Sequence, residues 1–177
     1  MRRFLDRLYS LSGALAAVCL AAICVVMLAQ AFGREAGILI RGADDITAWL
    51  CAASAFLAVG HTFRHGELVR VGLWLDLMKP TIRWYAELIA LSITAAFGVY
   101  MVWAVVRFVY DSWQLNDMAQ GLIQIPIWLP QTSLVVGCAV FLVAVLDELV
   151  THLRGRKTAY QAAEDLRHAQ ADFSDHL

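Results

Sequence analysis

The residues best suited to chemistry in this sequence are two histidines, His61 and His65, which lie four positions apart. On a helix this spacing puts both imidazoles on one face, where they could bind a haem or a metal ion. A transmembrane dihaem protein, however, needs two pairs of axial ligands from facing helices, and the other long apolar stretches contain no histidine. We therefore expect these side chains to meet lipid headgroups or a neighbouring subunit, and we keep a redox membrane anchor as an alternative.

The cysteines do not suggest an enzyme either. All four lie inside apolar stretches, where a thiol behaves as a small hydrophobic group. A disulfide-exchange enzyme needs exposed pairs that can reach one another, and no CxxC motif occurs. The sequence also lacks motifs for phosphate, metal or nucleophile chemistry. We expect a protein that is not an enzyme and that holds no cofactor or metal of its own.

Four long uncharged stretches must position these residues. A helix rises about 1.5 Å per residue and the hydrocarbon core of a bilayer is about 30 Å thick, so roughly 18 apolar residues suffice to cross it. The chain is 60% hydrophobic and 16% charged, whereas soluble domains are about 45 to 50% apolar and about 25% charged. The sequence therefore predicts an all-α integral membrane protein with four transmembrane helices. The stretches are Leu8 to Gly33, Ile46 to Phe63, Leu88 to Val106 and Met118 to Leu146.

Flanking carboxylates, aromatic residues and prolines adjust the ends of these stretches, because each residue type has a preferred place at a helix end or at the headgroup level. The first stretch is longer than the 7 to 15 residues of a signal-peptide core, so we expect it to stay in the protein. A transmembrane domain, residues 1–150, then precedes a cytoplasmic tail, residues 151–177, that is partly helical. The predicted spans are about 8–33, 44–65, 84–110 and 128–149.

The basic residues indicate the orientation, because cytoplasmic loops carry the excess of Lys and Arg. Four spans put the N-terminus, the second connection and the tail on one side of the membrane. These segments hold three, four and four basic residues, eleven of the fourteen in the chain. We therefore expect both termini to be cytoplasmic.

The second connection is expected to contain an amphipathic interfacial helix over residues 67–80. Its apolar residues recur with helical spacing and basic residues flank them, which is typical of a helix that lies flat on a membrane surface. Pro80 ends it. The residues expected to contact lipid or another subunit on the inner face are Arg64, His65, Arg70, Trp74 and Arg83.

The opposite, outer face has its own candidates. Asp44 and Asp45 directly precede the second uncharged stretch, where carboxylates cap free amides and suit the positive end of the helix dipole; a docking point for an external partner is the sharper hypothesis. Gln124 lies in an outer loop or re-entrant stretch, and Trp128 stands where the last helix should begin. Gly137, within that helix, permits close helix packing.

The deep parts of the predicted spans contain no Asp, Glu, Lys, Arg or His, the residues that mark ion and proton pathways. There is also no pair of Gly/Pro-broken helices in repeated halves, the usual sign of a transporter's own site. We therefore expect that the chain does not carry a substrate alone. A self-assembling small transporter or channel remains the second alternative.

Two short motifs add a resemblance to these inferences. Residues 60–71 read GHTFRHGELVRV, and residues 125–128 read IPIW, with Gly137 further along the last span. Over about residues 5–150 the chain resembles the small membrane subunit, DctQ-like, of a tripartite ATP-independent periplasmic (TRAP) transporter. Leu68 departs from the pattern, since the family often has histidine there.

This resemblance implies a protein of the bacterial inner membrane that pairs with a large permease subunit. The permease would carry out sodium-coupled elevator transport of an organic acid that a periplasmic binding protein delivers, and sodium would bind to the permease. The small subunit would brace the permease and help the binding protein to dock. Membrane lipids complete the expected partners, and no nucleic acid is expected.

Overall fold

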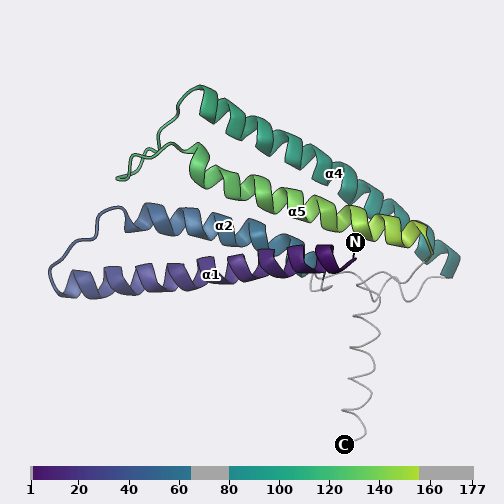
Figure 1. Ribbon diagram of the computed structural model, residues 1–177, viewed down its shortest axis with the longest axis horizontal. Coiled ribbons are helices and arrows are strands. Elements are labelled where there is room, and N and C mark those ends of the chain that lie inside the picture. Colours follow the sequence, from purple (N-terminus) through teal and green to yellow (C-terminus); the bar gives the residue numbers. More distant parts are fainter. Residues whose placement is uncertain (1, 65–79, 156–177) are drawn as a thin grey trace, which may run out of the picture.

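Long helices make up nearly all of the described chain. The computed structural model describes residues 2–64 and 80–155, and Figure 1 shows its helices. Each is long and apolar enough to cross a membrane. The predicted all-α class with four membrane-spanning helices is therefore confirmed for the described residues. The helices are α1 (Arg2–Glu35), α2 (Ala43–Arg64), α4 (Pro80–Gln114) and α5 (Trp128–Leu153).

Three of the helices are longer than the predicted spans, which were about 8–33, 84–110 and 128–149. At helical rise the 35 residues of α4 extend about 52 Å, more than the roughly 40 to 45 Å of a bilayer with its headgroups. The length of an uncharged stretch indicates only the part of a helix that lies in hydrocarbon. The backbone hydrogen bonds continue into the polar flanks, so polar residues such as Arg83 and His152 belong to the helices.

The helices pack in the spatial order α1, α2, α5, α4. The main contacts are α1 on α2, α2 on α5 and α5 on α4, so α2 and α5 are central and the other two are peripheral (Figure 1). We call the end that holds residues 36–42 and 115–127 the loop end. The opposite end, where α1 begins and α5 finishes, is the terminal end.

The core lies between the two central helices and reaches towards the terminal end. Phe63 of α2 and Phe141 of α5 meet edge to face, with ring centroids 5.5 Å apart, and Tyr9 of α1 is 1% exposed. Large apolar side chains elsewhere on α1 and α4 are exposed, as expected of surfaces that face lipid or another subunit. The buried residues of the core are Tyr9, Phe63, Leu91, Ala95, Val140, Ala144 and Val145.

Several predictions concern residues outside the described ranges. They are the interfacial helix over residues 67–80, apart from the start of α4 at Pro80, and the partly helical tail beyond residue 155. The positions of His65, Arg70 and Trp74 fall there as well. Arg64 is the last residue of α2, and its side chain is likewise not described.

Candidate functional site

The carboxylate of Asp45 holds the loop end together. Asp45 lies in the first turn of α2 and is half-buried. Its Oδ2 accepts hydrogen bonds from the backbone N–H groups of Leu122, at 2.8 Å, and Ile123, at 3.3 Å. Hydrogen bonds to an ionised acceptor are stronger than neutral ones. One side chain of α2 therefore fixes a loop that is 77 residues away in sequence.

This contact differs from the capping role that we expected for the acidic pair. Asp45 binds amides of the loop between α4 and α5, a partner that no local pattern could reveal. Asp44 is exposed, and its Oδ1 accepts a hydrogen bond from Gln30 Nε2 of α1 at 3.1 Å. Both carboxylates remain in the first turn, where negative charge suits the helix dipole. The pair thus links α2 to two other parts of the chain.

The loop itself, residues 115–127, folds back as a short hairpin. Met118 and Pro126 form an isolated antiparallel bridge. The N–H of Ala119 donates to the carbonyl of Ile125 at 2.9 Å. At the turn, a Cβ on Gly121 would overlap the Asp45 carboxylate, so this close approach requires glycine. Gln124 is exposed near the turn, on a backbone that Asp45 holds in place.

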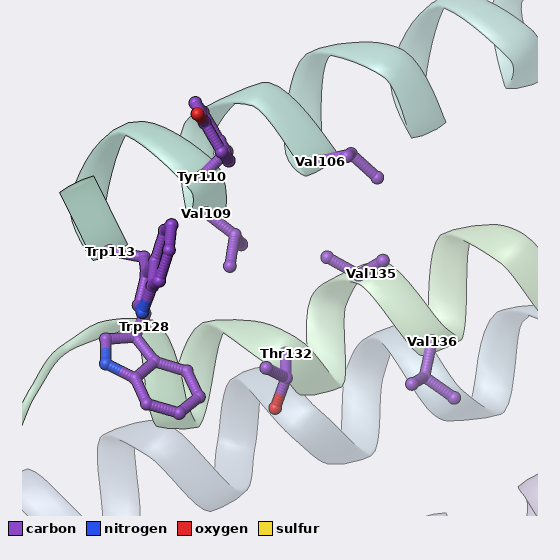
Figure 2. Close-up of a pocket in the computed structure, with 8 residues that line it drawn as sticks. All are labelled: Val106, Val109, Tyr110, Trp113, Trp128, Thr132, Val135 and Val136. Carbon is purple, nitrogen blue, oxygen red and sulfur yellow. The ribbon is translucent and has the colours of Figure 1, made fainter.

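Trp128, the first residue of α5, belongs to an apolar pocket between α4 and α5. The pocket has a volume of about 430 Å³. In Figure 2, Trp113 and Trp128 lie together at its loop end, and Val106, Val135 and Val136 lie further along the two helices. The hydroxyl of Thr132 donates to the carbonyl of Leu129 at 2.6 Å. The lining residues are Val106, Val109, Tyr110, Trp113, Trp128, Thr132, Val135 and Val136.

This lining can hold apolar groups but offers no chemistry. It has no charged side chain, and the hydroxyl of Thr132 is already bonded within α5. Tryptophan and tyrosine prefer the interface between hydrocarbon and headgroups. The pocket therefore has the character of a membrane-facing recess near one headgroup level rather than of a catalytic centre.

Gly137, the residue assigned to helix packing, lies on the inside of the chain. A Cβ built on it would come within 2.6 Å of the carbonyl carbon and oxygen of Phe56 in α2. Real Cβ atoms do not approach backbone that closely, so only glycine fits between the two central helices. The contact that this glycine serves is internal, between α5 and α2.

A polar cluster at the terminal end was missed by the sequence analysis. Arg83 Nε donates to Glu87 Oε1 at 3.0 Å. His152 Nε2 donates to the carbonyl of Trp84 at 3.2 Å, and its Nδ1 lies 3.6 Å from Glu87 Oε2. The imidazole also stacks on the Trp84 ring, with centroids 5.4 Å apart. Glu87 and His152 are 6% and 4% exposed.

Two residues of this cluster lie outside the uncharged stretches of the sequence. The third and fourth spans were described without histidine, yet α5 extends far enough to include His152. Arg83, expected at a lipid or subunit contact, is half-buried against Glu87. The four-residue spacing of Arg83 and Glu87 was the available signal, but it lay outside the uncharged stretch.

His61 also has an internal partner. Its Nδ1 donates to the carbonyl of Tyr9 at 3.1 Å, and its ring lies so close to Gly13 that a Cβ there would be 2.8 Å away. This histidine therefore ties α2 to α1. The sequence had suggested a contact with headgroups or with a neighbouring subunit instead. Within the described ranges, no group of three His, Cys, Asp or Glu side chains could hold a metal ion.

Comparison with known families gives a match over most of the chain. A family model described as "Tripartite ATP-independent periplasmic transporters, DctQ component" matches residues 23–155. The match includes α2, α4 and α5, the last third of α1 and both loops at the loop end. No curated protein matches the chain.

Proposed function

The chain belongs to the DctQ component family of tripartite ATP-independent periplasmic transporters, and from that membership we propose that it braces the large permease and helps the periplasmic binding protein to dock. The family is a transporter component and not an enzyme family. In this proposal the transporter takes up an organic acid together with sodium. Both solutes bind on other subunits.

The observation that carries the bracing role is the way the helices are held together. Polar contacts tie them at both ends, through Asp45 at the loop end and through Glu87 and His152 at the terminal end. The deep parts of the predicted spans have no Asp, Glu, Lys, Arg or His, so a charged substrate or ion has no built path there. Such an assembly suits a rigid support beside a transporter.

The docking role rests on the loop end. If the basic residues orient the protein as proposed, this end faces the periplasm. The hairpin is fixed to α2 by Asp45, while Gln124 and Asp44 are exposed. A surface that is held in place before binding loses little conformational freedom when a partner docks. Asp44, Asp45, Gln124 and Trp128 are therefore the proposed contacts or supports.

The terminal end would then face the cytoplasm. Arg64, His65, Arg70 and Trp74 remain the proposed contacts with lipid headgroups or with the permease. A cationic side chain near anionic lipid contributes roughly 1 kcal/mol of attraction. Arg83 differs from these four because it is paired with Glu87, so we propose that it supports the α4–α5 contact as well as the positive charge of this side.

Reconstituted vesicles that contain the permease, the binding protein and this chain test the proposal. We expect little uptake when the chain is omitted. Substitution of Gln124 or Trp128 by alanine should lower the rate of uptake without changing the order of preference among substrates. The affinity of the isolated binding protein for its substrate is the control. Full uptake without the chain, or a changed substrate preference, would show the proposal to be wrong.

A further inference from the structure

One face of α4 has no neighbour in the described chain. Four buried residues of this helix, Glu87, Leu91, Ala95 and Gly98, face α5, and α4 lies at an edge of the helix array (Figure 1). Much of the remaining surface of α4 is exposed, and eight of its exposed residues lie in line along one side at intervals of four and three. They are Ile89, Ile93, Ala96, Tyr100, Trp103, Arg107, Tyr110 and Gln114, and we call them the α4 seam.

The spacing of the seam is that of a helix-packing surface. Intervals of four and three residues keep side chains in line along a neighbouring helix that crosses at about 20°. Any line of residues along an exposed helix has this spacing, so the chemistry of the side chains decides between a protein neighbour and lipid. The seam runs over α4 from Ile89 to Gln114 and is exposed throughout.

The chemistry of the seam also points away from lipid. Counted at helical rise, Tyr100 lies about 22 Å from Tyr85 and about 20 Å from Trp113, the aromatic residues near the two headgroup levels. It is 62% exposed, and its hydroxyl has no hydrogen bond within the described part of the chain. A polar group in hydrocarbon without a partner is costly.

Trp103 and Arg107 continue this polar line towards the loop end. Trp103 is 56% exposed, and the guanidinium carbon of Arg107 lies 5.6 Å from the centre of its ring. Arg107 makes no ion pair with the described residues. By contrast, the exposed residues of α1 that face the middle of the membrane, such as Leu15, Val18 and Leu20, are aliphatic and suit lipid tails.

We propose that the α4 seam is the surface on which a transmembrane helix of the large permease packs, with a hydrogen-bond acceptor opposite Arg107. This inference rests on the proposed function. Lipid tails offer no acceptor to Tyr100, Trp103 or Arg107. A second copy of this chain, packed in parallel through the same seam, would bring two Arg107 side chains together, and like charges repel strongly where water is scarce. A helix with a carboxylate, hydroxyl or free carbonyl meets both requirements.

Photo-crosslinking in membranes that contain all three transporter components tests this surface. A photoreactive amino acid is placed at Tyr100 or Trp103, and at Leu15 or Leu20 of α1 as matched exposed controls. We expect adducts between this chain and the large permease from the α4 positions and none from the α1 positions. Adducts from α1 alone, adducts with the mass of two copies of this chain, or no protein adduct from any position would each overturn the inference.

Co-purification separates this inference from the proposed function. If the unmodified chain fails to purify with the large permease, the proposed function fails and the seam with it. If it does co-purify, Trp103→Ala and Arg107→Gln should reduce recovery of the permease about tenfold, as central interface residues do. Leu20→Ala should have no effect, and the amount of each variant in the membrane should be unchanged. Equal recovery with all three variants would place the permease on another face.

Discussion

His152 and Glu87 face each other across the contact between α4 and α5, with His152 Nδ1 3.6 Å from Glu87 Oε2. Both side chains are buried, and each has a second partner, the Trp84 carbonyl for His152 and Arg83 for Glu87. The start of α4 and the end of α5 are therefore joined by a polar cluster as well as by apolar packing. Because both side chains are buried, the cluster is sensitive to the loss of any one member.

Removal of either member of this pair should destabilise the protein, and removal of both should cost less than the sum of the two single losses. Glu87→Gln or His152→Gln leaves a buried polar partner uncompensated, which costs roughly 3 kcal/mol. The double variant should be more stable than the sum of the two single effects by about 1 kcal/mol or more. Thermal unfolding in detergent measures this coupling. If the two single losses of stability simply added in the double variant, the two side chains would not be coupled.

Asp45→Ala should loosen the hairpin of the loop end. The backbone N–H groups of Leu122 and Ile123 lose their acceptor, at a cost of about 1 to 3 kcal/mol, and hydrogen exchange of these two amides should accelerate. Uptake by the reconstituted transporter should slow. Asp44→Ala removes the same charge but only one bond, to Gln30, and should have a smaller effect on exchange. Equal protection of the two amides in Asp45→Ala and in the unmodified chain would contradict the proposed support.

Gly137→Ala should weaken the fold itself. The added methyl group meets the backbone of Phe56, which cannot move without displacing α2, and overpacking of this kind costs about 1 to 3 kcal/mol. A lower unfolding temperature in detergent, without any other subunit present, is the expected result. Ala21→Leu on the exposed side of α1 adds more volume but should be tolerated. If Gly137→Ala were harmful only in the presence of the permease, the internal contact would not be its role.

The orientation can be tested with topology reporters. A reporter fused after Leu177 should behave as cytoplasmic, whereas one inserted at Gly37 or Gly121 should behave as periplasmic. The reason is the distribution of basic residues, eleven of fourteen of which lie in the segments expected inside. Periplasmic activity of the Leu177 fusion would reverse the assignment of the two ends and with it the proposed docking surface.

The number and place of the membrane helices could be predicted because they depend on a local property. An uncharged stretch long enough to cross hydrocarbon is visible in the sequence itself, as at Leu8 to Gly33. Trp128 was correctly expected at the start of the last helix. The ends of α4 and α5 were less predictable, because backbone hydrogen bonding continues past the last apolar residue into charged flanks.

The partners of individual side chains depended on the tertiary structure. Asp45 looked like a helix cap, yet it binds a loop 77 residues away; His61 was expected at headgroups, yet it bonds to Tyr9. Composition and periodicity determine that a helix lies in the membrane, since both act through the surrounding solvent. Which face of α2 meets which face of α5 depends instead on the fit of all the helices together, down to a glycine against the Phe56 backbone.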